Sequence, residues 1–504
     1  MPKINARHKD YARMVNQWMR IDAAIAGEDT VKALKVAALP MPNAMDISLE
    51  NQQRYDSYLQ RAVWHAVSGR TLSNMVGQVF SIAPTSQLPG VLDELNVDVD
   101  GSGVNLAQQA KQTLSHVISK SRCGLFVDYP TTEGVTTIAD QQTNGIRPII
   151  LIFDPICIIN WRMTKRGALS QLSLVVIESD YVSNDDGFEV AYETEWKALR
   201  LLNGVYTVEV WRKVDDDFVK FSSVTPTNGA GKTMTEIPFI FVGVDANDYT
   251  VEKPLLGDIV SLNYAHFRDS ADYQEAVYML GQPTPFATGL TDDWIKRQLG
   301  GAISLGSRNI VPLPENATMG LLQVSPNTLP KEAMDQKEEQ MQSLGAMLVE
   351  RKKVAITATE AGINDAAETS ILSACANNVT AAYCHALVFA GAFANVDVPN
   401  DPINPIFELN TDFAVSRLNP NEVKATLDAY NGGLISFTEA RDKLKRGGYA
   451  FEEDEIVKGE IDQKAEADLQ AAMAQAQAAK PVIVPAGGKP TPAKKTAKKA
   501  TKPA

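Results

Sequence analysis

Apolar and polar positions alternate with the spacing of an α-helix over residues 254–280. Pro254 suits the first turn of a helix, and Gly281 followed by Pro283 suits its end. One face carries mostly polar residues at intervals of three and four, namely Asp258, Ser261, Ala265, Arg268, Asp272 and Glu275. The opposite face carries Leu256, Val260, Tyr264, Phe267, Ala271 and Tyr278. The pattern predicts a helix with one solvated stripe and one packed stripe.

The pattern changes after this helix and then becomes helical twice more. Residues 286–324 form short runs broken by glycine and proline, which indicates a small β-rich module. A second helix is predicted over 330–353, with one apolar face at Met334, Met341, Leu344 and Leu348. Residues 354–363 show no clear period. A long helix is predicted over 364–395, with apolar residues at Ile371, Cys375, Val379, Ala382, Ala386, Phe389 and Phe393.

The first 253 residues mix helical and strand patterns. Helices are predicted over residues 6–26, 46–79 and 106–121, with Asp46 as a cap and Gly69 as a break in the middle one. Strand patterns follow at 124–128, 148–161, 170–179, 188–201, 205–213, 217–224 and 235–242, and Asp154-Pro155 interrupts the second of them. Their alternation and β-branched residues favour a mostly antiparallel sheet, so this region is predicted to be α+β.

The chain after residue 397 begins with a proline-rich connection and continues with short elements. A strand is predicted at 405–413, and helices are predicted at 420–430, 436–446 and 454–478. Residues 479–504 are rich in Lys, Ala, Pro and Thr and too poor in apolar residues to fold. We therefore expect a disordered basic tail, which includes Lys494, Lys495, Lys498 and Lys499.

Composition and charge limit the class of protein. The chain has 504 residues, is 44% hydrophobic and carries a formal charge of −13, although its last sixteen residues hold six lysines and no acid. An acidic body argues against a broad grip on nucleic acid, because phosphate contacts need Lys and Arg, but it allows DNA to slide past. We expect a cytosolic origin without a membrane partner, because the sequence has neither a signal-peptide pattern nor the roughly 18 apolar residues of a membrane helix.

Candidate catalytic and metal-ligating residues are scattered along the chain. Buried free thiols are expected for the four cysteines, which form no CxxC pair: Cys123, Cys157, Cys375 and Cys384. No His, Cys or acidic cluster accompanies His65, and this favours a packed histidine over a metal ligand. The other histidines complete no catalytic set, and they are His8, His116, His266 and His385. The sequence therefore predicts no enzyme, no cofactor and no metal.

Two short motifs suggest ligands but have the wrong spacing. Residues 228–233, NGAGKT, end like a phosphate-binding loop, but Pro226 stands where that loop needs its first glycine. A strand pattern also follows, where a helix N-terminus is needed. Residues 96–101, NVDVDG, open like a calcium loop, but Ala107 stands where the bidentate Glu is required. A turn is the favoured interpretation of both motifs, and nucleotide and calcium binding are the minor alternatives.

The order of elements resembles that of the portal proteins of tailed bacteriophages. Several strings are also similar to one portal-like phage family: YLQRAVWHAVSGRTLSNMVG, SRCGLFVDYP, IINWR, ATEAGINDAAETSILSACANNV and GLISFTEARDKLKRGGY. The resemblance spans residues 45–465 and implies a mainly helical α+β portal architecture with wing, stem, clip and crown regions. The implied regions are a wing at 1–253, stem helices at 254–280 and 328–353, a β-rich clip at 281–327, a tunnel loop at 354–363, a long wing helix at 364–397, a strand with crown helices at 398–478 and the tail at 479–504.

The resemblance also implies a function. Portal proteins are not enzymes; they form a ring of about twelve subunits at one capsid vertex of the virion, after synthesis in the host cytoplasm. Double-stranded DNA passes non-specifically through the channel during packaging and ejection. The implied partners are the terminase large subunit, head-completion adaptor or tail proteins, and the major capsid and scaffold proteins. The alternative is another phage head structural or scaffold-interacting protein without a channel, and a weaker one is an enzyme that uses the GKT turn.

Candidates for the channel wall come from both stem helices. They are Arg351, Lys352, Lys353, Arg268, Asp258, Asp272 and Glu275. Residues 351–353 end the second stem helix, where capping of the helix by cations is the simpler explanation. In the portal interpretation they touch passing phosphates weakly. The lysines of the tail have a simpler explanation as well, which is a solubilising segment.

Overall fold

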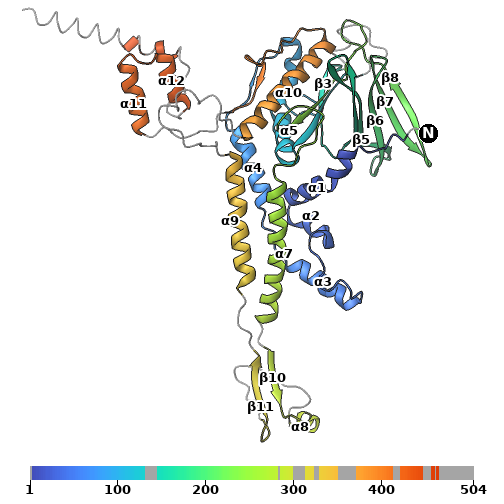
Figure 1. Ribbon diagram of the computed structural model, residues 1–504, viewed down its shortest axis with the longest axis vertical. Helices are drawn as coiled ribbons and strands as arrows, with labels where there is room; N and C mark the ends of the chain where they lie inside the picture. The colour runs from blue at the N-terminus through green and yellow to red at the C-terminus, as the bar shows by residue number, and fades with distance from the viewer. Residues whose placement is uncertain are drawn as a thin grey trace, which may run out of the picture. The chain divides into compact units, whose positions relative to one another are not determined.

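The structure is a computed structural model, and it describes residues 3–130, 145–281, 284–298, 313–322, 328–349, 371–411, 420–446, 456–459, 461 and 463–464. The chain divides into two compact units, Met1–Phe413 and Ala414–Ala504. Helices and antiparallel sheets both occur in the larger unit (Figure 1). The predicted α+β class is therefore confirmed.

The amino-terminal part of the larger unit is helical, as its periodicity predicts. Its helices are α1 (Lys9–Ala26), α2 (Glu28–Ala33), α3 (Leu49–Arg61), α4 (Val67–Val79) and α5 (Leu106–Lys120), with short 3-10 helices at Lys35–Ala37 and Gly90–Asn96. Helix α1 buries Trp18 and Ile21 completely. Helix α5 begins with a capping box, in which the side chains of Asn105 and Gln108 each accept the other's backbone N–H.

Two details of residues 46–79 differ from the prediction. The cap of α3 is Ser48 rather than Asp46, because Ser48 Oγ accepts a hydrogen bond from Asn51 N at 3.2 Å. The break between α3 and α4 falls at residues 62–66, and Gly69 lies inside α4. A Cβ at Gly69 would lie 3.3 Å from the carbonyl oxygen of Ile25, so this glycine lets α4 approach the end of α1. Close packing explains the glycine, not a helix end.

Two antiparallel sheets follow the helices. A three-stranded sheet has the order β3-β2-β9, and a five-stranded sheet has the order β4-β5-β6-β7-β8. The strands are β2 (Arg122–Asp128), β3 (Ile149–Phe153), β4 (Ile158–Arg166), β5 (Leu169–Asp185), β6 (Val190–Leu202), β7 (Val205–Val214), β8 (Asp217–Val224) and β9 (Phe239–Gly243). Asn203 and Gly204, both with positive φ, form the tight turn that joins β6 to β7.

The interruption at Asp154-Pro155 separates two strands, as predicted, and also separates the two sheets. Strand β3 pairs with β2, whereas β4 pairs with β5. The buried Lys120, at the end of α5, places its ammonium between the carboxylates of Asp154 and Asp22, and it lies 2.7 Å from Asp22 Oδ1. His116 Nδ1 also lies 3.2 Å from Asp154. This buried ionic cluster fixes the corner between the sheets against α5 and α1.

Helix α10 (Ile371–Ala394) runs through the core of the larger unit. It packs against α5 and strands β2 and β9 (Figure 1). The predicted apolar series is buried at every position except Ile371. The hydroxyl of Tyr383 lies 2.9 Å from Thr113 Oγ1 and 3.1 Å from Gln109 Oε1, so a buried polar contact also ties α10 to α5. The part of the predicted helix at 364–370 lies outside the described residues.

The segment before α10 contains a helix, a small hairpin and a second helix. Its elements are α7 (Gly257–Leu280), β10 (Thr284–Thr288), α8 (Asp292–Gln298), β11 (Thr318–Leu322) and α9 (Leu329–Val349). Strands β10 and β11 pair antiparallel from Thr284 with Leu322 to Thr288 with Thr318. A β-rich excursion between two helices is therefore confirmed in this part of the chain, while the loop predicted at 354–363 lies outside the described residues.

The remaining elements are short. Strand β12 (Phe407–Glu408) pairs with β1 (Thr85–Ser86), so the strand predicted at 405–413 is only two residues long as described. In the smaller unit α11 (Pro420–Asn431) and α12 (Phe437–Arg446) match two predicted helices, and Tyr430 contacts Phe437 edge to face. All four cysteines are free thiols, and Cys123, Cys375 and Cys384 are buried as expected, whereas Cys157 is only half-buried. The tail at 479–504 lies outside the described residues.

Candidate functional site

Helices α7 and α9 form an antiparallel pair, shown side by side in Figure 1. Near the start of α7, Asp258 lines a small cavity with Leu344, which is close to the end of α9. Farther along α7, the Asp269 carboxylate binds the ammonium of Lys337, which comes earlier in α9, so the two helices run in opposite directions. The packed stripe predicted for α7 is buried at Leu256, Val260, Tyr264, Phe267 and Ala271. The prediction is wrong for Tyr278, because its ring is exposed instead of packing in the core. The centroid of this ring lies 4.2 Å from the Arg61 guanidinium.

The polar stripe of α7 contacts the amino-terminal segment of the same chain. Arg268 Nε donates to the carbonyl oxygen of Ala38 at 3.1 Å, and Asp272 accepts a 2.6 Å hydrogen bond from the hydroxyl of Tyr58. Glu275 forms an ion pair with Arg61. Burial and the hydrogen bond to Asp272 raise the pKa of Tyr58. These polar residues therefore have partners within the chain, although Arg268 and Asp272 keep exposed surface.

Of the other predicted channel residues, the structure describes only Asp258. Asp258 is exposed near the start of α7 and pairs with Lys253 at 2.7 Å. Arg351, Lys352 and Lys353 lie outside the described residues. The same holds for the lysines of the tail, Lys494, Lys495, Lys498 and Lys499. Contact of any of these side chains with DNA stays a prediction.

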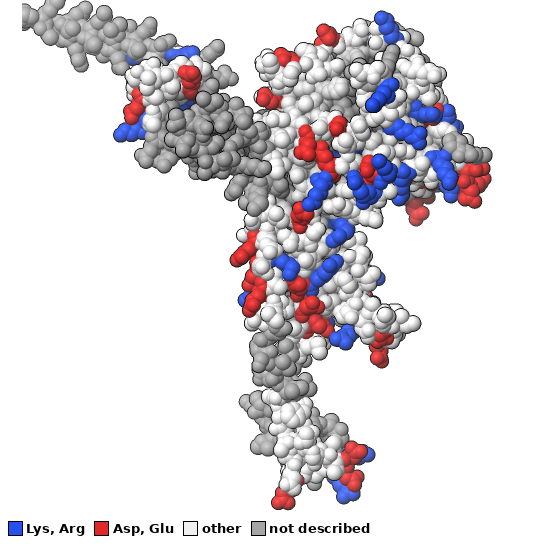
Figure 2. All heavy atoms as spheres, viewed as in Figure 1, with Lys and Arg blue, Asp and Glu red and all other residues white. Residues whose placement is uncertain are grey.

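Helix α9 has a face that sequence reasoning did not single out. Its inner side carries the buried Met341 and the half-buried Leu344. Its outer side exposes Glu332 and Glu339, whereas Asp335 is also exposed but lines a cavity beside Glu338. Figure 2 shows acidic side chains along α9, while Lys and Arg gather over α1 and the five-stranded sheet. The signal in the sequence was the run KEAMDQKEEQ, whose acids recur with helical spacing.

Two histidines and a glutamate meet beside this helix pair, so the premise that no such group accompanies His65 is wrong. His65 Nδ1 lies 2.9 Å from Glu338 Oε1, and His266 Nε2 lies 3.2 Å from the same oxygen. The ligand atoms of the three residues all lie within 4.8 Å of one another. His65 belongs to the 62–66 connection, His266 to α7 and Glu338 to α9. The spacing of residues along the sequence could not predict this cluster, because its three members come from distant parts of the chain.

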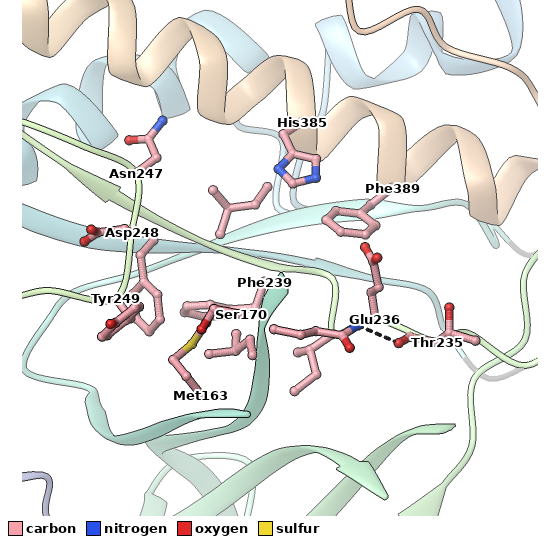
Figure 3. A pocket seen from close by; sticks show the side chains of 15 residues that line it. Met163, Ser170, Thr235, Glu236, Phe239, Asn247, Asp248, Tyr249, His385 and Phe389 are labelled. Carbon is pink, nitrogen blue, oxygen red and sulfur yellow. Dashed lines mark hydrogen bonds between the residues drawn. The ribbon is translucent and has the colours of Figure 1, made fainter. Parts of the chain in front are cut away.

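A larger cavity, of about 700 Å³, lies beside α10 (Figure 3). His385 of α10 stacks on Phe389 with ring centroids 4.8 Å apart, and burial lowers the pKa of its imidazole. Ser170 comes from β5, next to Met163, and lies apart from His385 in this view. These two residues therefore form no nucleophile–base pair. The cavity is a mainly apolar volume with Glu236 and Asp248 at its lining.

The two loop motifs form turns. Asn228 Oδ1 accepts hydrogen bonds from Ala230 N and Lys232 N, and Thr227 bridges Thr233, so NGAGKT closes a short loop on itself. The N–H groups of Ala230, Gly231 and Lys232 thus already donate to Asn228, and that of Gly229 donates to the carbonyl oxygen of Ala392. In the other motif, Asp98 accepts the N–H groups of Gly101 and Gly103 and pairs with Arg147 at 2.7 Å. The turn interpretation is confirmed for both motifs.

Comparisons with known proteins bear on the segment that contains the helix pair. A family described as Domain of unknown function (DUF4055) matches residues 254–394, which extend from just before α7 to the end of α10. No curated protein matches the chain. In the part of the chain that the structure describes, no helix is both long and apolar enough to cross a membrane.

Several solved structures are similar to this chain at low sequence identity. One is the neck of an empty GTA particle computed with C6 symmetry, at 13% identity and a TM-score of 0.38, covering 76% of this chain and 90% of that chain. Another is the virion of a native gene transfer agent (GTA) particle, at 12% identity and a TM-score of 0.38, covering 77% of this chain and 92% of that chain. A third is the neck of a native GTA particle computed with C12 symmetry, at 13% identity and a TM-score of 0.37, covering 75% of this chain and 89% of that chain.

Proposed function

We propose that this chain is a portal protein, which assembles into a ring homo-oligomer of about twelve subunits at one capsid vertex. The observation that carries the proposal is the antiparallel pair of α7 and α9. The paired strands β10 and β11 lie between these two helices in the sequence, and α10, which lies in the core, follows them. This is the order of stem, clip, stem and long helix that the sequence resembles. The ring channel would pass double-stranded DNA during packaging and ejection.

The surface of α9 supports this function. A channel wall needs a helix that is packed on one side and solvated on the other, and α9 is buried at Met341 and exposed at Glu332 and Glu339. A wall rich in Lys and Arg would bind phosphates by releasing counterions, which would hold a moving duplex. An acidic face confines DNA without binding it. We therefore place the outer face of α9, rather than the polar stripe of α7, toward the channel.

The hairpin region supplies a surface for a second copy of the chain. Four apolar side chains are exposed at the end of α7 and on the two strands, and they are Val277, Met279, Phe286 and Leu321. Exposed apolar groups of this kind mark surfaces that another protein covers. A neighbouring subunit in the ring is the occupant that we propose. The terminase large subunit, and later head-completion adaptor or tail proteins, would then dock on the assembled ring.

Native mass measurement and negative-stain imaging of the purified chain test the proposal. The expected result is a ring with a central channel for the natural sequence. The double variant Val277→Glu and Met279→Glu should release monomers, because two charges per subunit would then be buried at each contact. Phe188→Glu is the matched control, since this side chain is exposed on the β5–β6 turn, and it should leave the ring intact. A stable monomer or dimer of the natural chain at several salt concentrations would instead support a head or scaffold-interacting protein without a channel.

The cations at 351–353 give a second, finer test of the channel. Exposed charge pairs contribute about 0–1 kcal/mol each and are screened by salt, so contacts with phosphates should be weak. Replacing Arg351, Lys352 and Lys353 together with Ala should leave the ring assembled and change the DNA content of particles. Replacement with Glu should reduce that content further. Equal DNA content in both variants and the natural protein would show that these cations only cap a helix.

A further inference from the structure

We propose that His65, His266 and Glu338 form a binding site for one divalent transition-metal ion of the zinc type. The site lies where the connection between α3 and α4 meets the helix pair α7–α9. Nothing in the ring proposal requires it, so the two can be tested separately.

The donor chemistry fits such an ion. Two imidazole nitrogens and one carboxylate are a ligand set that zinc uses, with a fourth position left for water or another oxygen. His266 is buried, its Nε2 lies 3.2 Å from Glu338 Oε1, and its ring centroid lies 5.4 Å from that of His65. Its Nδ1 has no hydrogen-bond partner among the described residues.

The distances are also close to those of a metal centre. Ligand atoms about 2.0–2.1 Å from a tetrahedral zinc lie roughly 3.3 Å from one another. The two nitrogen–oxygen distances to Glu338 Oε1 are 2.9 and 3.2 Å, and the whole set spans 4.8 Å. Small rotations of the two rings would bring all three donors to one centre. The half-exposed His65 makes such an adjustment easy on its side of the site.

A cavity beside the cluster provides access and a further ligand. Its volume is about 310 Å³, and it is lined by His65, His266 and Glu338 together with Ser270, Tyr273, Gln274, Lys331 and Asp335. Asp335 lies one helical turn before Glu338 on α9, so its carboxylate is on the same side of that helix. Two carboxylates would neutralise the charge of a divalent ion, whereas Glu338 alone would leave one positive charge.

Binding would couple three segments that are distant in sequence. An ion held by all three residues would bind the folded chain and not the unfolded one, so it would stabilise the position of the 62–66 connection against both helices. The same ion would fix α9 to α7 at a point next to the ion pair between Lys337 and Asp269.

The test uses the full-length chain after removal of metal with EDTA. Zinc chloride is titrated in the presence of a chromophoric chelator, and cobalt chloride reports ligand geometry through its visible absorption. We expect one tight zinc site per chain and a tetrahedral cobalt spectrum. Loss of a residue that only hydrogen-bonds to a metal ligand weakens metal binding roughly 10–100-fold. His65→Ala and Glu338→Gln remove ligands themselves, so each should weaken zinc binding by more than that. His385→Ala is the matched control, because this histidine lies at a separate cavity and should leave binding unchanged.

His65 is the main variant, because replacement of the buried His266 could disturb folding. Circular dichroism in EDTA verifies that each variant keeps its helices. The proposal is overturned if the natural chain fails to compete with the chelator for zinc. It is overturned as well if the double variant His65→Ala and Glu338→Gln binds zinc as tightly as the natural chain, or if His385→Ala weakens binding as much as His65→Ala.

Discussion

Helices α10 and α9 are similar in length, 24 and 21 residues, but they are held in opposite ways. Helix α10 contains no Asp, Glu, Lys or Arg, and it is buried on most sides by α5, β2 and β9. Helix α9 is rich in charge, buries one side only and contacts α7 through Lys337 and His–Glu interactions. Apolar burial on several sides fixes a helix in one place. One-sided packing with ionic contacts leaves a face available for partners.

The comparison predicts where substitutions should be most costly. Phe126 of β2 is fully buried in the core that surrounds α10, so Phe126→Ala should lower the free energy of unfolding by about 3–5 kcal/mol. Urea denaturation followed by tryptophan fluorescence measures the change. The matched control is Phe188→Ala, a side chain that is 98% exposed, which should change stability by less than about 0.5 kcal/mol. Similar effects of the two substitutions would contradict the location of the core.

A smaller effect is expected at the buried ionic cluster of the same region. Burial would raise the pKa of Asp154, but the hydrogen bond with His116 and the charge of Lys120 outweigh it and hold the pKa well below its ordinary value. Asp154→Asn should therefore cost about 1.5–3 kcal/mol at pH 7, because Lys120 keeps only Asp22 as a charged partner.

The sign of the pH dependence follows from the lowered pKa. The stabilisation by Asp154 is complete above the unfolded-state pKa of about 3.9 and is lost as the pH falls toward the folded-state pKa. The difference between Asp154→Asn and the natural chain should thus shrink below about pH 4 in thermal melts. Asp216→Asn, at a fully exposed carboxylate, is the control and should show no comparable difference. A gap that stays constant down to pH 3 would mean that the charge of Asp154 is not what stabilises the fold.

The smallest effect is expected between α7 and α9. The ion pair of Asp269 with Lys337 is partly exposed, so its coupling energy should be about 0–1 kcal/mol and should fall with added salt. A double-mutant cycle with Asp269→Asn and Lys337→Met isolates this coupling. The exposed pair of Lys253 with Asp258 provides a reference cycle, which should be close to zero. A large, salt-independent coupling would show that α9 is fixed as firmly as α10 and would end the contrast between them.

Periodicity in the sequence determined the existence and order of most elements. The buried series of α10, the packed stripe of α7 and the alternating strands of the five-stranded sheet all follow from residue spacing, because apolar side chains must share one face to be buried together. The turn at 228–233 also followed from local chemistry, since Pro226 excludes the phosphate loop. Local rules sufficed wherever the determining residues are neighbours along the chain.

Tertiary structure alone decided the features that depend on distant residues. The sequence marked Gly69 as a helix break, but the approach of Ile25 makes it a packing position inside α4. It made His65 a solitary histidine, but folding brings His266 and Glu338 to it. It placed the polar stripe of α7 in solvent, but Tyr58 and Arg61 contact that stripe. The physical reason is the same in each case: a contact between residues distant in sequence, whether steric, polar or ionic, acts at short range and leaves no period in the sequence, so its partner is known only once the chain is folded.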